Sequence, residues 1–134
     1  MTDEKGTWEG MRKHLANLVT GLAERPKAIV VVTAHWERDG GVGITSGERP
    51  SLIYDYYGFP PETYKIQWPA PGSPKTAKRV HDLLNDAGIP SALEPKHGWD
   101  HGVFIPLKAS TKRARHCRLL YALLLWNVEV SRGT

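Results

Sequence analysis

The sequence of 134 residues contains very little cysteine and no long apolar run. Its single cysteine, Cys117, has no second thiol in the chain, so an internal disulfide is excluded. No segment approaches the ~20 consecutive apolar residues that a membrane span needs. The first ten residues also lack the basic start and apolar core of a signal peptide. From these absences we expect a reduced, cytoplasmic protein with no membrane partner.

Several short motifs that mark common sites are absent as well. The sequence has no HExxH, CxxC, P-loop or GxGxxG pattern, which argues against the common zinc-protease, zinc-ribbon, nucleotide and dinucleotide sites. It also has no internal repeat and no low-complexity tract. With 40% apolar and 24% charged residues, the composition is typical of one globular domain.

Positive charge is concentrated at the C-terminal end. The formal net charge is +4, and residues 1–108 are balanced, so the whole excess lies within residues 109–134. A net positive charge is typical of proteins with an anionic partner, but its confinement to one stretch makes it the mark of a boundary between a charge-balanced body and a different tail. Residues 112–118 also lack interleaved aromatic side chains and any known nucleic-acid motif, so we expect no nucleic acid partner.

Hydrophobic periodicity predicts an α/β domain with a mostly parallel sheet and flanking helices. We expect a helix over 7–23 and a strand over 28–34 that is covered on both faces, because it is a continuous β-branched run. Ser73 and Pro74 indicate the start of a second helix that ends at Gly88. Shorter strands are expected over 42–45 and 91–94.

Two segments have no such regular pattern. Residues 51–71 combine four Tyr, one Phe, one Trp and four Pro, which favours a structured aromatic loop. Residues 119–126 are an unbroken apolar run, for which we expect a helix.

Two histidines are candidates for chemistry because each is expected where a strand meets a loop, the place where ligands bind in open α/β sheets. His35 follows the strand over 28–34 and suits a metal ligand, although a structural or exposed histidine is the alternative. His101 lies between Asp100 and Gly102 and suits general acid/base work. Its alternative is a loop histidine that pairs with Asp100. His97 is near enough in sequence to line the same site.

Four blocks carry a resemblance to a known family. Residues 26–36 (PKAIVVVTAHW), 54–64 (YDYYGFPPETY), 68–74 (WPAPGSP) and 98–107 (GWDHGVFIPL) together resemble the class III extradiol ring-cleavage dioxygenases. The similarity is to the subunit-B-type branch that includes DOPA 4,5-dioxygenase-like proteins. It implies a parallel-sheet α/β domain with one non-haem metal ion, Fe(II) or Zn(II). It also implies cleavage of a catechol-type ring with O2.

The resemblance assigns roles to individual residues. It implies that His35 ligates the metal and that His101 is the catalytic acid/base. The aromatic loop with Tyr54, Tyr56, Tyr57 and Phe59 resembles the segment that lines the substrate pocket. The resemblance implies substrate contacts for Tyr54, Tyr57 and Phe59, with His97 beside them. For any one of these aromatic residues, a packed cluster under a long loop is the alternative.

The chain also departs from the family pattern. The family opens with a strand that ends in an HG-type metal ligand, whereas this sequence opens with the following helix. We therefore expect an incomplete member at both ends, truncated relative to the family domain. Residues 1–108 form a partial catalytic domain in this interpretation, and residues 109–134 form a divergent basic and apolar tail.

An isolated chain with one protein ligand would hold Fe(II) weakly, so we expect it to be weakly active or inactive. The alternative function is a non-enzymatic binding or interaction protein on the same fold. A homo-oligomer is left open by the sequence.

Overall fold

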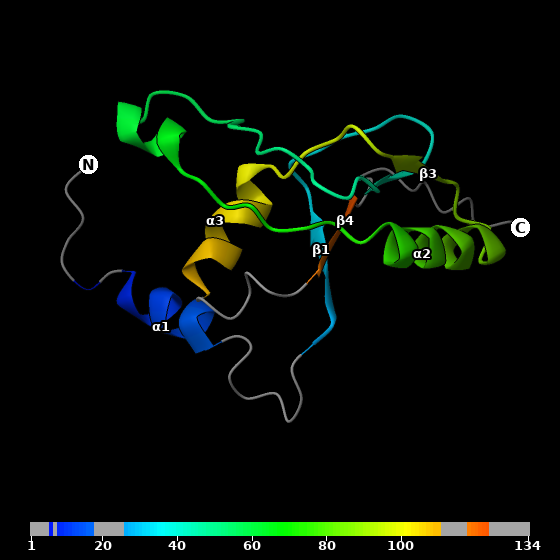
Figure 1. Cartoon of the computed structure of the whole chain (residues 1–134), viewed down its shortest axis with the longest axis horizontal. Coiled ribbons are helices and arrows are strands. Elements are labelled where there is room, and N and C mark those ends of the chain that lie inside the picture. The colour runs from blue at the N-terminus through cyan, green and yellow to red at the C-terminus, as the bar shows by residue number, and fades with distance from the viewer. Residues whose placement is uncertain (1–5, 7, 18–25, 111–117, 124–134) are drawn as a thin grey trace, which may run out of the picture.

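The computed structural model describes residue 6 and residues 8–17, 26–110 and 118–123. Its centre is a four-stranded sheet with helices beside it (Figure 1). The strands lie in the order β1 (Ala28–Thr33), β4 (Arg118–Leu123), β2 (Val42–Thr45) and β3 (Ser91–Glu94). The β1–β4 and β2–β3 pairs are parallel, and the β2–β4 pair is antiparallel. The predicted α/β fold with a mostly parallel sheet is confirmed.

Strand β1 has one buried and one exposed face. Ile29 and Val31 pack against the main core, whereas Val30 and Val32 are each 51% exposed. The prediction that this strand is covered on both faces was therefore wrong. A continuous β-branched run favours a strand, but composition alone does not report how many layers cover it.

Strand β4 corrects a second prediction. It pairs with β1 over its whole length, from Ala28 opposite Arg118 to Thr33 opposite Leu123. The helix expected over 119–126 is wrong for 119–123, and residues 124–126 lie outside the described residues. A short apolar run is compatible with either structure, and here the edges of β1 and β2 supply hydrogen-bond partners on both sides.

Helix α2 (Pro74–Asp86) packs against the sheet near β2 and β3. Its Ala77 forms a small core with Val42 and Ile44. The predicted start at Ser73 and Pro74 is confirmed, and Gly88 follows the helix with a φ of 75°, a conformation that glycine adopts without strain.

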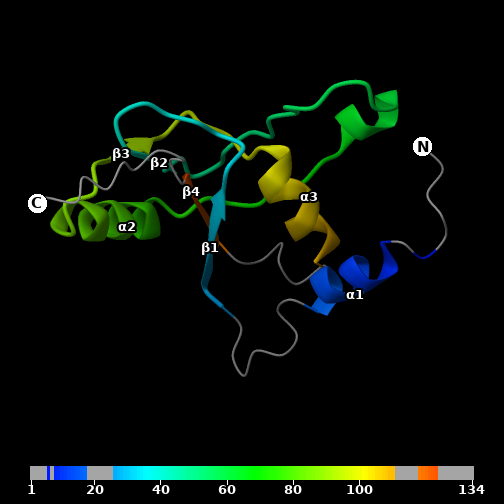
Figure 2. The same ribbon diagram turned by 180° about the vertical axis from the view of Figure 1, so that it is seen from behind.

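Helices α1 (Glu9–Asn17) and α3 (His101–Ala109) lie side by side at the other end of the molecule (Figures 1 and 2). The predicted first helix is confirmed over 9–17, while residue 7 and residues 18–23 lie outside the described residues. None of the helices that the structure describes is long and apolar enough to cross a bilayer.

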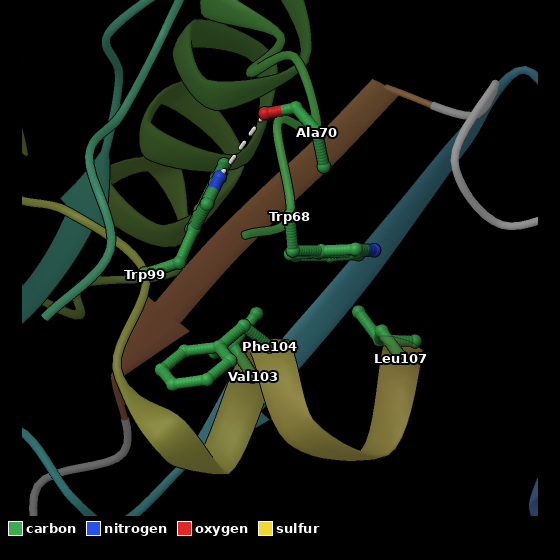
Figure 3. Close-up of a cluster of buried hydrophobic side chains, with 6 residues drawn as sticks. All are labelled: Trp68, Ala70, Trp99, Val103, Phe104 and Leu107. Atoms are coloured by element: carbon green, nitrogen blue, oxygen red, sulfur yellow. Dashed lines mark hydrogen bonds between the residues drawn. The ribbon is translucent and has the colours of Figure 1, made fainter. Parts of the chain in front are cut away.

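The main core joins α3 to the aromatic segment 51–71, which carries the short 3-10 helix η1 (Pro61–Lys65) (Figure 3). The indole N–H of Trp99 donates a hydrogen bond to the carbonyl oxygen of Ala70 at 3.2 Å. Burial of this cluster holds the aromatic segment, α3 and β1 together. Its fully or nearly fully buried members are Trp68, Ala70, Trp99, Val103, Phe104 and Leu107.

Candidate active site

Two segments that are far apart in sequence run side by side next to α3. The backbone N–H of Ile53 donates to the carbonyl of Trp99 at 2.8 Å, and the N–H of Trp99 donates to the carbonyl of Ser51 at 2.7 Å. A Cβ at Gly98 would overlap the Ser51 carbonyl, so this close approach requires glycine. The pairing brings Asp55 and His101, a few residues further along the two segments, to the same place.

His101 is the first residue of α3 rather than the end of a strand, so the expected strand-to-loop junction was wrong at this histidine. The preceding Asp100 is the N-cap, and its carboxylate accepts a hydrogen bond from the backbone N–H of Val103 at 3.2 Å. A helix N-terminus has unpaired N–H donors and a partial positive charge, which explains why acidic side chains gather there.

Asp55 contacts His101 through both carboxylate oxygens. Oδ1 accepts from the backbone N–H of His101 at 2.8 Å, and Oδ2 lies 2.9 Å from the ring Nδ1. Partial burial raises the pKa of Asp55, but these hydrogen bonds outweigh burial and hold that pKa below its ordinary value. Asp55 is therefore a carboxylate at neutral pH, and Asp55, rather than the Asp100 of the alternative interpretation, is the acidic residue that contacts the His101 ring.

His35 follows β1 and stacks on His101, with ring centroids 4.3 Å apart. Its Nδ1 lies 3.1 Å from the hydroxyl oxygen of Thr33 and 3.8 Å from Oδ1 of Asp100. The structure thus brings together the predicted metal ligand and the predicted acid/base.

A cavity of about 300 Å³ opens beside the His101 ring. The edge-to-face ring of Tyr56 lies 5.8 Å from His101, measured between centroids. The remaining surroundings are largely apolar, so the cavity suits a small planar ligand. Its lining residues are Tyr56, Phe59, Thr63, Ile66, His101 and Ile105.

The other residues predicted for substrate contact take different places. Phe59 lines the cavity, whereas the Tyr54 hydroxyl donates to the Ile66 carbonyl at 2.6 Å and its ring packs edge-on against Phe104. Tyr57 is 92% exposed.

His97 is half-buried and stacks on Trp36 with centroids 3.5 Å apart. Burial lowers the pKa of His97, because desolvation disfavours the imidazolium, although Asp100, Glu94 and Asp55 oppose this change. The ring of His97 thus stacks on a side chain that itself packs against the main core.

The donor set around His35 fits one metal ligand but not a complete site. Its Nδ1 faces the Thr33 hydroxyl and the Asp100 carboxylate. Such neighbours orient the imidazole ring of a metal-binding histidine, which leaves Nε2 as the nitrogen that could bind a metal. Within the ranges that the structure describes, however, no three His, Cys, Asp or Glu side chains come together as a metal-binding group. Three-ligand sites are what hold Fe(II) or Zn(II) with positions open for substrate.

Sequence reasoning missed Asp55 as a functional residue. It lies 46 residues before His101, and only the backbone pairing of the two segments brings it into contact. An aspartate in an aromatic, Pro-rich loop is only weak evidence of a functional role. Ile66, Ile105 and Thr63 were missed in the same way, because each belongs to the cavity only through the folded arrangement.

Comparison with known proteins places the chain in a family. Residues 2–128 match the family described as the catalytic LigB subunit of aromatic ring-opening dioxygenase. The chain therefore belongs to this family, and the resemblance found in the sequence is confirmed. The match continues past Leu107, where the last of the four sequence blocks ends. The division of the chain near residue 108 stays a prediction.

Several curated relatives of the chain are named as dioxygenases. The chain is 45% identical over 84 residues to the dioxygenase TasH of Hapsidospora irregularis. It is 44% identical over 84 residues to a 4,5-DOPA dioxygenase extradiol of Portulaca grandiflora, and 49% identical over 79 residues to one of Escherichia coli K12. These alignments include 62%, 62% and 58% of this chain, but only 26%, 31% and 28% of the respective relatives.

A solved structure has the same fold. The crystal structure of an uncharacterised protein from Escherichia coli K12 superposes with a TM-score of 0.59 and 34% sequence identity. The match covers 83% of this chain and 38% of that protein. The chain thus spans a minor part of the length of the relatives that it matches.

Proposed function

We propose that this chain supplies part of the active site of an extradiol dioxygenase, which opens a catechol-type aromatic ring with O2. The observation that carries the proposal is the position of His101, which has a carboxylate on its ring Nδ1 and borders an apolar, aromatic-lined cavity. Family membership and the dioxygenase names of the relatives support the same reaction class.

His101 has the properties of a general acid/base in this proposal. An imidazole accepts and returns a proton near neutral pH, and the proton of a catechol hydroxyl would be taken up by its ring. Asp55 would stabilise the imidazolium that forms, because its carboxylate lies 2.9 Å from Nδ1. Both side chains are partly exposed, at 36% for His101 and 25% for Asp55, so water screens part of this charge interaction.

The substrate would lie against Phe59 and Tyr56 in the cavity. Aromatic rings in edge or offset geometry favour a planar guest, and a volume of about 300 Å³ is large enough for one small ring system. Substrate contacts of Tyr54, Tyr57 and His97 stay predictions. Tyr54 also supports the aromatic wall in this proposal, because its ring packs edge-on against Tyr56 and Phe104.

The implied cofactor is one Fe(II) or Zn(II) ion, for which His35 is the proposed ligand. When bound, such an ion acts as a Lewis acid that makes a catechol easier to deprotonate. Because the described residues bring together no group of three donors, we derive no reaction step through the metal. We propose that the isolated chain is weakly active or inactive for the same reason. Its cytoplasmic location also stays a prediction.

Oxygen uptake tests the proposed weakness of the isolated chain. The protein is loaded anaerobically with Fe(II) and mixed with a panel of catechols, while ring-opened product is followed by absorbance. We expect turnover at or near background. Robust turnover that disappears in His35→Ala, but persists in the exposed control His14→Ala, would contradict the proposed inactivity.

Catechol binding tests the reaction class separately. Methyl resonances of Ile66 and Ile105 should shift when catechol enters the cavity. Phe59→Ala should weaken this response, whereas Leu83→Ala, at an exposed position of α2 outside the cavity lining, should leave it unchanged. A saturable response is expected, and its absence at millimolar catechol would remove the support for a catechol site.

The incomplete donor group also favours a second candidate, a non-enzymatic binding protein on the same fold. Such a protein would fold stably, contain no metal by elemental analysis and bind no catechol. A specific protein partner together with those results would favour this alternative.

A further inference from the structure

We propose that Asp55 is a positioning residue that decides which ring nitrogen of His101 carries the proton. In this arrangement Nδ1 carries the hydrogen and Nε2 is the nitrogen that accepts a proton from substrate. The inference rests on the proposed acid/base role of His101 and deepens it by naming the group that prepares the histidine.

The evidence is a two-point contact. One oxygen of Asp55 accepts from the backbone N–H of His101 at 2.8 Å, which anchors the carboxylate to the first residue of α3. The other oxygen then lies 2.9 Å from Nδ1. Since an ionised carboxylate can only accept hydrogen bonds, the hydrogen must be on Nδ1. The neutral ring is thereby held in the tautomer with an unprotonated Nε2.

The rest of the surroundings does not compete for Nδ1. His35 stacks face-on to the ring, and Tyr56 approaches with its ring at 83° to the imidazole. The Tyr56 hydroxyl is engaged elsewhere, because it donates to the Thr63 carbonyl at 2.7 Å. Among the residues that the structure describes, Asp55 alone supplies a side-chain hydrogen bond to the His101 ring.

The position of Asp55 is itself fixed by backbone structure. The isolated parallel bridge between Leu52 and Trp99 aligns the two segments, and the fully buried Trp99 anchors the bridge in the core. Asp55 also belongs to the same loop as Tyr56 and Phe59. One loop therefore provides both the cavity wall and the group that orients the acid/base.

Asp55→Asn separates this role from a structural one. The side-chain carbonyl oxygen of the amide can still accept from the His101 backbone N–H, so the anchor is retained. The amide NH2 group then faces Nδ1 and donates, which favours an unprotonated Nδ1 and places the hydrogen on Nε2. The Asp→Asn change in a serine-protease triad has this effect: the geometry is kept, but the catalytic histidine has the wrong tautomer.

The measurement is imidazole ¹⁵N NMR on the full chain with labelled histidine, at a pH where the ring is neutral. We expect Nδ1–H in the wild type, Nε2–H in Asp55→Asn, and no preference for Nδ1–H in Asp55→Ala. The matched control is Asp82→Asn on the exposed side of α2, where Asp82 pairs with Lys78, and it should leave the His101 resonances unchanged.

Each result decides the matter. Nε2–H in the wild type, or the same tautomer in the wild type and Asp55→Asn, would overturn the proposal. If Asp55→Asn fails to fold, the wild-type tautomer alone decides. If Nδ1–H is found but catechol does not bind, the positioning role stands and the proposed function fails. If catechol binds but the wild type has Nε2–H, the proposed function stands and the positioning role fails.

Discussion

Gly102 touches the imidazole of His35 so closely that a methyl group on its Cα would overlap Nδ1 of the ring. The same methyl group would lie 2.9 Å from the Thr33 hydroxyl oxygen. The absence of a side chain at the second residue of α3 therefore permits the stack between His35 and His101.

Gly102→Ala should displace His35 without unfolding the protein. Alanine in a helix gains about 1 kcal/mol over glycine, which offsets part of the overlap. We expect the nuclear Overhauser contacts between the His35 and His101 rings to disappear, with a net stability change within about 1 kcal/mol.

The matched control for that variant is Gly10→Ala in α1, where a Cβ meets nothing within 4 Å. This variant should be more stable than the wild type by about 0.5–1 kcal/mol, from the higher helix propensity of alanine alone. Equal gains in both variants, together with an intact ring stack, would show that the contact imposes no constraint.

Phe104→Ala should be strongly destabilising. The side chain is fully buried between Trp99, Val103 and the aromatic segment, so its removal leaves a cavity. We expect a loss of about 3–5 kcal/mol in the free energy of unfolding, measured by urea denaturation. Phe59→Ala removes the same ring from an exposed position and should cost less than about 1 kcal/mol. A loss below about 1 kcal/mol for Phe104→Ala would contradict the described core.

Asp100→Ala should remove the cap of α3. The carboxylate accepts from the Val103 N–H, so its loss should cost about 1 kcal/mol. Asp100→Ser keeps a capping oxygen and should recover most of that stability. Ser73→Ala is a useful comparison, because the Ser73 hydroxyl lies 2.7 Å from the Thr76 hydroxyl and caps no backbone N–H of α2. Equal losses in Asp100→Ala and Asp100→Ser would show that the carboxylate stabilises the fold in another way.

Stability should fall as the pH is lowered through the range where His97 titrates. Burial holds the folded-state pKa of His97 below the value in the unfolded chain, which is about 6.5. The unfolded state therefore binds this proton more readily, and the stabilisation is complete above about pH 6.5 and lost as the pH falls toward the folded-state pKa.

His97→Phe keeps an aromatic ring against Trp36 and removes the titration. Chemical denaturation on either side of about pH 6.5 should show a smaller decline toward acid for this variant than for the wild type. An identical decline in both proteins would assign the pH dependence to other groups.

The sequence by itself determined the helix beginning at Ser73 and Pro74, the short strands over 42–45 and 91–94, and the strand that ends before His35. These elements follow from local signals: cap residues, β-branched runs and Gly or Pro punctuation. The four sequence blocks also indicated the family, because they combine residue identity with order along the chain.

Tertiary structure decided what local signals do not contain. Whether the run after Arg118 becomes helix or strand depended on the open edges of β1 and β2. The partner of His101 depended on a backbone pairing that spans 46 residues, which selected Asp55 over the adjacent Asp100. Hydrogen bonds and ring stacking act over a few ångströms of space. The residues that prepare the histidine are therefore defined only once the aromatic segment has packed against α3.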